Sequence, residues 1–402
     1  MFQLSDTLIH EDSLVRLRHD LHREPELGLD LPLTQRKVLD ALDGLPLEIT
    51  LGKRLSSVTA VLRGGRPGPA VLLRADMDAL PVQEDSGVPY ASAVPGRMHA
   101  CGHDLHTAGL VGAARLLAAR REELTGDVVL MFQPGEEGMR GAALMVEEGV
   151  LDAAGSRVVA AYALHVTSSV LPTGYAAVRP GPMLAASDAV TVRVDGSGGH
   201  GSSPHSAKDP VPAVCEMVMA LQTMVTRTVD VFDPAVVTVG SLHAGSAGNV
   251  IPQSAEFEAT VRSFSRETQT KVRAGIEQTV RGVAAAHGVD VAIDYQENYP
   301  VTVNDPAEAA FGLRTARGLF GTDHAFEAPR PVTGSEDFSF VLREVPGAYL
   351  GLGACPPDRD PATAPYNHSP RAVFDDRAVL DAALLLAELA AGRLQGTTEE
   401  DS

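Results

Sequence analysis

Short apolar segments recur along this chain, and their spacing strongly limits the folds it can adopt. The clearest are residues 58–62, 70–73, 128–132, 158–164 and 348–352. Segments of this length, rich in Val, Leu and Ala and separated by helical stretches, are typical of buried strands. Alternating buried strands and helices predict an α/β fold, with a mixed, mainly parallel sheet flanked by helices.

Polar side chains directly follow several of these predicted strands. Asp76 and Asp78 come after the second segment, Glu136 and Glu137 after the third, and His165 after the fourth. In an open parallel sheet, the functional crevice lies outside the carboxyl ends of the strands. We therefore expect these side chains to share one site.

Residues 99–104 carry the strongest chemical signal in the chain. Cys101 and His103 place a thiolate and an imidazole two positions apart, and Asp104 precedes an apolar helical pattern over residues 105–117 that it is suited to cap. Both donor types bind transition metals. The segment therefore predicts half of a metal site on a short loop before a helix.

Glu137, His165 and His368 supply further donors, enough for two neighbouring metals that each keep an open coordination position. If Glu137 is a ligand, its neighbour Glu136 is left to take a proton from water. Cys101 could instead be a nucleophile beside His103, but no oxyanion-hole signature accompanies it. A nucleoside-type zinc deaminase is disfavoured because its Pro-Cys-x-x-Cys motif is absent.

The pattern changes between about residue 184 and residue 296. Strands are expected at 189–194, 235–242, 255–263 and 289–295, and helices at 210–228 and 268–286. This β-α-β-β-α-β order is typical of a ferredoxin-like α+β domain. We therefore predict a discontinuous catalytic domain over 1–184 and 297–402, with an inserted domain over 185–296.

Charge and cysteine content exclude several classes of partner. The chain has 52 acidic and 33 basic residues, a formal net charge of −19, which disfavours binding to nucleic acid or to anionic membranes. Its three cysteines are odd in number, which argues against a disulfide framework. With no leader pattern at the N-terminus and no long apolar run, the sequence predicts a cytoplasmic protein.

Six blocks of the sequence, in order, resemble the M20 metallopeptidase family. They lie at residues 74–81, 98–106, 133–138, 198–201, 334–338 and 368–370. The amidohydrolase branch, with hippurate hydrolases, N-acyl-amino-acid amidohydrolases and auxin-conjugate hydrolases, is the most similar. The resemblance implies a zinc-exopeptidase-like catalytic domain with an inserted lid and dimerisation domain, and hence a homodimer.

The same resemblance implies roles for residues of the catalytic domain. The metal ligands would be Cys101, His103, Glu137, His165 and His368. Glu136 would be the general base, and Asp78 would orient a ligand. The wider family has an aspartate where this chain has Cys101, so the two divalent ions could be Zn²⁺ or Mn²⁺, or alternatively Co²⁺ or Ni²⁺.

In the inserted domain, His200 resembles the lid histidine of the family, which reaches across a dimer and stabilises an oxyanion. Asn249 and Arg262 match positions that contact substrate, and an arginine suits a carboxylate because its planar fork binds both oxygens. Gly334 belongs to a loop that lines the site in the family. No role follows for His205.

Together these features predict a metal-dependent amidohydrolase that cleaves small N-acyl amino acids, such as N-acetyl or N-benzoyl compounds. A dipeptidase or carboxypeptidase of the same family would use the same metals and base on a peptide. A non-catalytic metal-binding relative is the third alternative, against which the complete set of ligands and Glu136 argues.

Overall fold

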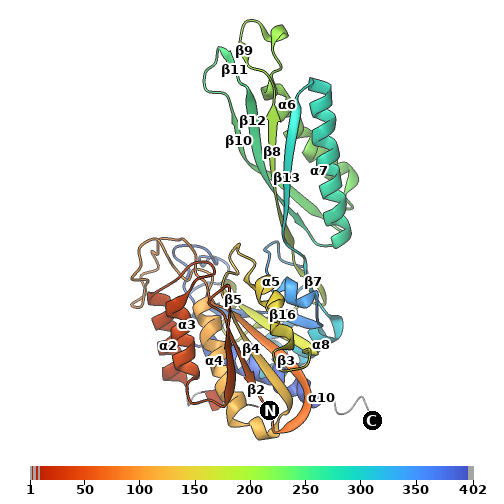
Figure 1. Ribbon diagram of the computed structural model, residues 1–402. Coiled ribbons are helices and arrows are strands. Elements are labelled where there is room, and N and C mark those ends of the chain that lie inside the picture. The colour runs from red at the N-terminus through yellow and green to blue at the C-terminus, as the bar shows by residue number, and fades with distance from the viewer. Residues whose placement is uncertain (1, 3–5, 8–9, 397–402) are drawn as a thin grey trace. The chain divides into compact units, whose positions relative to one another are not determined.

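The computed structural model describes residues 2, 6–7 and 10–396 (Figure 1). They form two compact units. The first contains the described residues of Met1–Met183, Val303–Arg330 and Asp337–Ser402, and the second consists of Leu184–Thr302 and Pro331–Glu336. The chain passes from the first unit to the second after Met183 and again after Arg330, and it returns each time. Each unit is therefore described separately.

A mixed sheet forms the centre of the first unit, with the strand order β1-β2-β4-β3-β5-β16-β6-β15. These strands are β1 (Leu47–Leu51), β2 (Val58–Leu62), β3 (Arg66–Asp76), β4 (Thr125–Gln133), β5 (Ala160–Pro172), β6 (Ala176–Val178), β15 (Ala325–Glu327) and β16 (Gly347–Cys355). The central neighbours β4, β3, β5 and β16 pair in parallel, whereas β1 and β2 are antiparallel at one edge. The predicted mixed, mainly parallel sheet is therefore confirmed.

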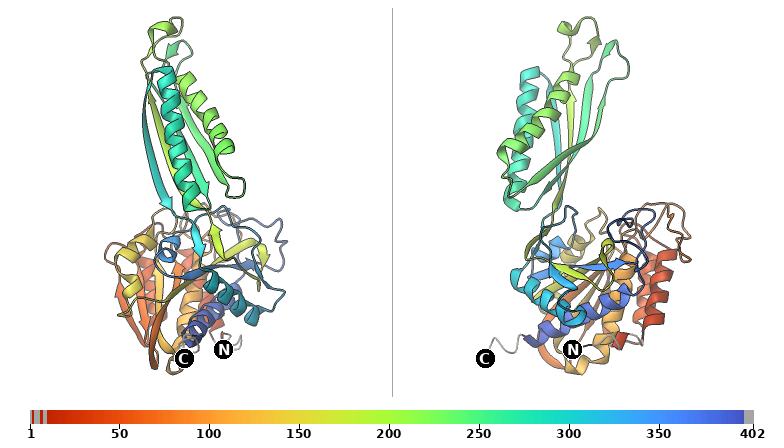
Figure 2. Two further views of the ribbon diagram at one scale, coloured as in Figure 1. Left: turned by 90° about the vertical axis from the view of Figure 1, so that its right-hand side faces the viewer. Right: turned by 180° about the vertical axis from the view of Figure 1, so that it is seen from behind.

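Helices flank this sheet, and two of them approach each other closely. They are α2 (Glu11–Arg23), α3 (Pro32–Leu42), α4 (His103–Ala119), α5 (Gly141–Glu147), α8 (Pro306–Phe320), α9 (Ser339–Leu342) and α10 (Ala378–Gly396). α4 packs side by side with α10 against β3 (Figure 2). A Cβ on Gly109 or Gly112 would lie 2.8 and 2.6 Å from the Cβ atoms of Ala382 and Ala383, so glycine permits the approach. None of the helices in the described part of the chain combines the length and apolar character needed to cross a membrane.

The second unit is a four-stranded antiparallel sheet with two helices on one face (Figure 2). Its elements are β8 (Ala186–Asp195), α6 (Pro210–Thr228), β10 (Ala235–Ala244), β12 (Ser254–Ser263), α7 (Arg266–His287) and β13 (Asp290–Tyr299). Buried and more exposed residues alternate along β8, as expected for a sheet covered on one face. The strand order β10-β12-β8-β13 confirms the predicted ferredoxin-like arrangement.

Short strands lie at the tip of the second unit and where the chain passes between the units. β9 (Gly199–His200) pairs with β11 (Val250–Ile251) at the tip. β7 (Gly181–Leu184) and β14 (Thr302–Asn304) lie near the chain crossings.

The second unit differs from the predicted insertion at 185–296 in two ways. Its main stretch is slightly longer, Leu184–Thr302, and it also includes residues 331–336, which fall within the range 297–402 predicted for the catalytic domain. The backbone N–H of Ala185 donates to the carbonyl oxygens of Val332 and Gly334 at 3.1 and 2.9 Å. These hydrogen bonds join segments about 150 residues apart, and no local pattern in the sequence indicates such pairing.

A buried acid in α10 leads to a prediction about stability. Asp381 is 2% exposed, and among the described residues its Oδ2 has no hydrogen-bond partner. Burial raises its pKa to about 6. Since the raised pKa favours the protonated form in the folded state, stability falls as pH rises from the unfolded-state pKa of about 3.9 through the folded value.

Asp381→Asn is expected to increase the free energy of unfolding at neutral pH by about 3 kcal/mol, because the charge no longer has to be buried. The gain should shrink as pH falls from about 6 to about 4. Urea unfolding of both proteins across this range measures the effect, with exposed Asp358→Asn as the control. A pH-independent difference would contradict the explanation.

Candidate metal centre

The predicted ligands Cys101 and His103 lie where a short loop leads into α4. Gly102 precedes the helix with φ +87°, a conformation that glycine adopts readily. A Cβ at this position would lie 2.5 Å from Val166 Cγ2. The glycine between Cys101 and His103 therefore lets the loop lie against the strand that carries His165.

Two imidazoles meet the thiol of Cys101. Its Sγ lies 3.2 Å from His165 Nε2 and 3.2 Å from His368 Nε2. His165 lies in β5, and His368 lies in the segment between β16 and α10. Cys101 is buried, whereas the side chain of His368 is 54% exposed, so solvent reaches the cluster from the His368 side.

The loop after β4 brings the two glutamates to the same place. The backbone N–H groups of Glu136 and Glu137 donate to the two carboxylate oxygens of Asp78, at 3.0 and 2.9 Å. Glu137 Oε1 lies 3.2 Å from His368 Nε2. Asp78 therefore fixes the loop that carries both glutamates.

The donor atoms of these residues form overlapping groups within 4.8 Å of one another. The groups are Cys101 with His103 and His165, Cys101 with Glu137 and His368, and His103 with Glu136 and Glu137. The structure thus brings together all five predicted ligands and the predicted base. Cys101 takes part in two of the groups, which is the arrangement a bridging donor requires.

Two atoms of the cluster fit a metal on chemical grounds. His103 Nδ1 donates to the backbone oxygen of Asp78 at 2.8 Å, so the neutral ring has an unprotonated Nε2. In the part of the chain that the structure describes, His103 Nε2 is buried without a hydrogen-bond partner, and the buried Glu137 Oε1 lies 3.2 Å from His368 Nε2. A buried polar atom without a partner is costly, and coordination to a cation would satisfy both atoms.

Cys101 dominates the electrostatics of the cluster. Burial opposes ionisation of its thiol, but the charges of His165 and His103 hold its pKa well below the usual range. Although burial disfavours a charged ring, the Cys101 thiolate raises the pKa of His165 to about 9. Hydrogen bonds to Cys101 and Glu137 raise the pKa of His368 to about 10. The thiolate therefore attracts positive charge into the site.

Asp104 does not cap α4, so this expectation was wrong. The helix begins two residues earlier than expected, at His103, with Gly102 at the N-cap position and no side-chain cap. The buried Asp104 carboxylate instead accepts hydrogen bonds from Arg18 Nε at 3.2 Å and His22 Nδ1 at 2.9 Å. Burial opposes the charge on His22, but Asp104 raises its pKa to about 9, with Glu84 contributing. The ion pairs of Asp104 with Arg18 and His22 therefore hold α2 against the start of α4.

A second buried pair supports the strand that carries His165. His106 Nδ1 donates to Asp76 Oδ1 at 2.6 Å, and its Nε2 accepts the backbone N–H of Val166 at 2.8 Å. The ring is therefore a neutral tautomer with both nitrogens satisfied. Asp76, the last residue of β3, gave a signal in the sequence, but the role of His106 became apparent only from the structure.

The remaining predicted residues lie in the second unit. His200 in β9 is exposed, and its Nδ1 accepts the backbone N–H of Ser202 at 3.1 Å. A neutral His200 ring therefore carries its proton on Nε2, which makes Nε2 a hydrogen-bond donor. Asn249 is adjacent, because its backbone oxygen accepts the N–H of Gly201 at 2.9 Å.

Arg262 and Gly334 form another neighbouring pair in this unit. Arg262 Nη1 donates to the Oγ of Ser335, the residue directly after Gly334, at 2.9 Å. Burial lowers the pKa of Arg262, partly offset by the charge of Asp188. The guanidinium is therefore half-buried beside a loop hydroxyl, an arrangement compatible with binding a carboxylate.

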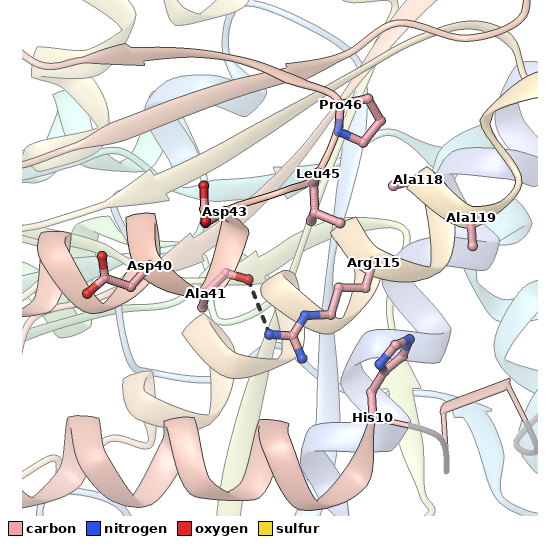
Figure 3. Close-up of a pocket in the computed structure, with 9 residues that line it drawn as sticks. All are labelled: His10, Asp40, Ala41, Asp43, Leu45, Pro46, Arg115, Ala118 and Ala119. Atoms are coloured by element: carbon pink, nitrogen blue, oxygen red, sulfur yellow. Dashed lines mark hydrogen bonds between the residues drawn. The ribbon is translucent and has the colours of Figure 1, made fainter.

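A separate pocket lies away from all of these residues. It has a volume of about 580 Å³ and is lined by His10, Asp40, Ala41, Asp43, Leu45, Pro46, Arg115, Ala118 and Ala119 (Figure 3). Arg115 donates to the backbone oxygen of Ala41 at 3.2 Å. No residue of the metal-ligand groups lines this pocket, so it is separate from the candidate metal centre.

Comparison with known proteins gives a consistent result across the chain. The model of Peptidase family M20/M25/M40 matches residues 72–391. Hippurate hydrolase of Campylobacter jejuni is 36% identical over 380 residues, covering 93% of this chain and 95% of that protein. Thermostable carboxypeptidase 2 of Saccharolobus solfataricus is 36% identical over 347 residues, covering 85% and 86%.

A solved structure extends the comparison to three dimensions. The Bacillus subtilis YXEP protein, a dinuclear metal binding peptidase from the M20 family, has a TM-score of 0.82 to this structure at 32% identity. The similarity covers 96% of this chain and 99% of that one. The likeness therefore includes both units and the loops that carry the cluster.

Proposed function

We propose, from the premise that this chain belongs to peptidase family M20/M25/M40, that it hydrolyses the amide bond of N-acyl amino acids to a carboxylic acid and a free amino acid. The observation that carries the proposal is the cluster of donor atoms around Cys101. Similarity to hippurate hydrolase supports a small N-acyl amino acid as the substrate.

In this proposal, Cys101, His103, Glu137, His165 and His368 hold two divalent ions, Zn²⁺ or Mn²⁺, with Co²⁺ and Ni²⁺ as alternatives. The mixed thiolate, imidazole and carboxylate donors suit such ions. When bound, the ions activate water and polarise the scissile carbonyl.

In the proposed reaction, Glu136 transfers the proton, and other residues position its loop or bind the substrate. Glu136 accepts a proton from the attacking water and later returns it to the leaving nitrogen, so its carboxylate is regenerated. Asp78 is a positioning residue, because its two oxygens hold the amides of Glu136 and Glu137. Arg262, Asn249 and the Gly334 loop would bind the substrate, with the Arg262 guanidinium on its carboxylate.

We further propose a cytoplasmic homodimer. β10 is an edge strand of the second unit, and it follows Val231 and Phe232, which are 79% and 94% exposed. An unpaired edge beside exposed apolar side chains favours association with a second copy. Light scattering of the purified protein tests this, and a monomer at assay concentration would contradict it.

His200 leads to a prediction about catalysis in such a dimer. Its Nε2 donor is suited to an oxyanion, and losing such a donor costs about 10²–10³-fold in kcat. His200→Ala should therefore lower kcat to that extent without changing metal content. His287→Ala, on α7 of the same unit, is the control.

Mixing the His200→Ala and Glu136→Gln proteins should restore part of the activity if the site is shared between copies. Full activity of His200→Ala alone would contradict the role proposed for His200.

A carboxypeptidase is the second candidate, supported by the similarity to thermostable carboxypeptidase 2. Elemental analysis, followed by turnover of N-acetyl amino acids, N-benzoyl amino acids and dipeptides, distinguishes the two. Faster turnover of peptides than of N-acyl amino acids would replace the proposed substrate class. A protein that binds metal but hydrolyses none of these compounds would exclude both candidates.

A further inference from the structure

Asn367 makes an unusually complete set of hydrogen bonds for a residue in a loop. Its Nδ2 donates to the backbone oxygens of Cys101 at 3.2 Å and Val166 at 3.0 Å, and it lies 3.9 Å from Cys101 Sγ, within reach of a longer sulfur hydrogen bond. Its Oδ1 accepts the backbone N–H of Ser168 at 3.0 Å and the Ser168 hydroxyl at 3.1 Å. Backbone carbonyls only accept and a backbone N–H only donates, so these partners determine the orientation of the amide.

These bonds connect three segments that each carry a proposed metal ligand. Asn367 immediately precedes His368, and its partners lie on the Cys101 loop and on β5 just after His165. The three segments are far apart in the sequence, so no local turn holds them together. The single amide therefore bridges all three.

The contact with Val166 also bears on the orientation of His165. The backbone oxygen of Val166 accepts both Asn367 Nδ2 and His165 Nδ1, the latter at 2.7 Å. His165 Nε2 faces Cys101 Sγ, so with Nδ1 held by the Val166 oxygen it is Nε2 that is available as the metal ligand. Asn367 thus binds the same carbonyl that orients this ligand.

His368 needs such support because its own backbone is strained. It has φ +70°, in the left-handed region that non-glycine residues rarely adopt. A conformation of this kind persists only when the surrounding structure enforces it. The hydrogen bond from His368 N to the Ala100 oxygen, at 2.8 Å, and the five side-chain contacts of Asn367 provide that restraint.

We infer that Asn367 is a positioning residue that sets the spacing of Cys101, His165 and His368 and so preforms their part of the metal centre. The inference rests on the ligand set proposed above. Asn367 is not itself a ligand; it acts through the segments it connects and through its contact with Cys101 Sγ. Its loss should therefore weaken metal binding rather than remove a chemical step.

The expected result is a fall of about 10–100-fold in the affinity for at least one ion, the usual range for hydrogen bonds that orient metal ligands. Asn367→Ala removes all five side-chain contacts. Asn367→Asp keeps the acceptor but replaces the donor that faces two carbonyl oxygens. Both variants should lose affinity, and Asn367→Asp shows whether the donor is what matters.

Asn304→Ala is the matched control. Asn304 is buried and also makes side-chain hydrogen bonds to backbone groups, donating to Arg179 O and Tyr349 O and accepting from Tyr349 N. None of these partners is a proposed ligand or its neighbour in sequence. This variant should lower the thermal stability of the metal-free protein while leaving metal affinity unchanged.

The experiment titrates Zn²⁺ into each stripped full-length protein in competition with a chromophoric chelator. The Co²⁺ forms are then compared by their thiolate-to-cobalt charge-transfer absorption. Weaker Zn²⁺ binding and an altered Co²⁺ spectrum in both Asn367 variants, but not in Asn304→Ala, support the inference. Unchanged affinity and spectrum in the Asn367 variants overturn it, as does an equal loss in the control.

Failure of the proposed function would look different. In that case the wild-type protein itself would bind no ion with useful affinity, or Cys101→Ser would bind Zn²⁺ as tightly as wild type. With wild-type binding intact and dependent on Cys101, a result on Asn367 concerns the positioning role alone.

Discussion

Glu136→Gln is expected to lower kcat by about 10²–10⁴-fold, the usual contribution of a positioned general base. The amide has nearly the shape of the carboxylate but cannot accept the proton of the attacking water. Because the backbone of Glu136 is held by Asp78, the loop should keep its conformation. Turnover of an N-acyl amino acid at saturating concentration, with metal content measured on the same sample, tests the prediction.

Two further variants separate the role of Glu136 from other effects of losing a carboxylate. Glu137→Gln should lose metal as well as activity, since Glu137 belongs to the group with Cys101 and His368. Glu122→Gln, whose side chain is 74% exposed, should change neither. Wild-type turnover by metal-loaded Glu136→Gln would exclude Glu136 as the base.

The sequence alone predicted that Glu136 belongs to the site, whereas it gave no role for His106. Glu136, Glu137 and His165 were predictable because each follows an apolar segment of the sequence, and parallel strands end at the same edge of a sheet. β4, β3 and β5 do pair in parallel, so the loop after β4 converges on His165. His165 itself lies within β5, because this strand continues to Pro172 instead of ending at residue 164. The convergence thus followed from backbone periodicity, without knowledge of any side-chain contact.

The supporting contacts could not be predicted in this way. Asp104 was expected to cap its own helix because capping is a local interaction with a known sequence signal. In the structure its partners Arg18 and His22 lie 86 and 82 positions away. Asn367 reaches Cys101 across 266 positions. Pairings at such distances depend on how the strands assemble, and one sequence carries no periodic signal for them.

The second unit shows the same division between local and long-range information. Alternating burial along β8 and β12 reflects residue patterns visible in the sequence, so the ferredoxin-like order was predictable. The pairing of Ala185 with Val332 and Gly334 was not, because this isolated contact forms through backbone atoms that every residue has.

Cys101→Ala is expected to have the largest effect on metal content. Removing a direct ligand should cost more than the roughly 10–100-fold loss of affinity caused by removing an outer hydrogen bond. Cys101 Sγ belongs to two of the donor groups, so a single substitution weakens both proposed ion positions. Elemental analysis of the protein purified in parallel with wild type measures the loss, and an unchanged content of two ions would contradict a bridging role.

Cys101→Asp provides the informative comparison, since the wider family has an aspartate at this position. A carboxylate can still bridge two cations, but it is a harder donor than a thiolate and favours Mn²⁺ over Zn²⁺ more than the cysteine does. We therefore expect Cys101→Asp to retain metal and measurable turnover, with activity shifted toward the Mn²⁺-loaded form. If Cys101→Asp behaves like Cys101→Ala, then the thiolate is required for its own chemistry, and the role of Cys101 as an exchangeable bridge is wrong.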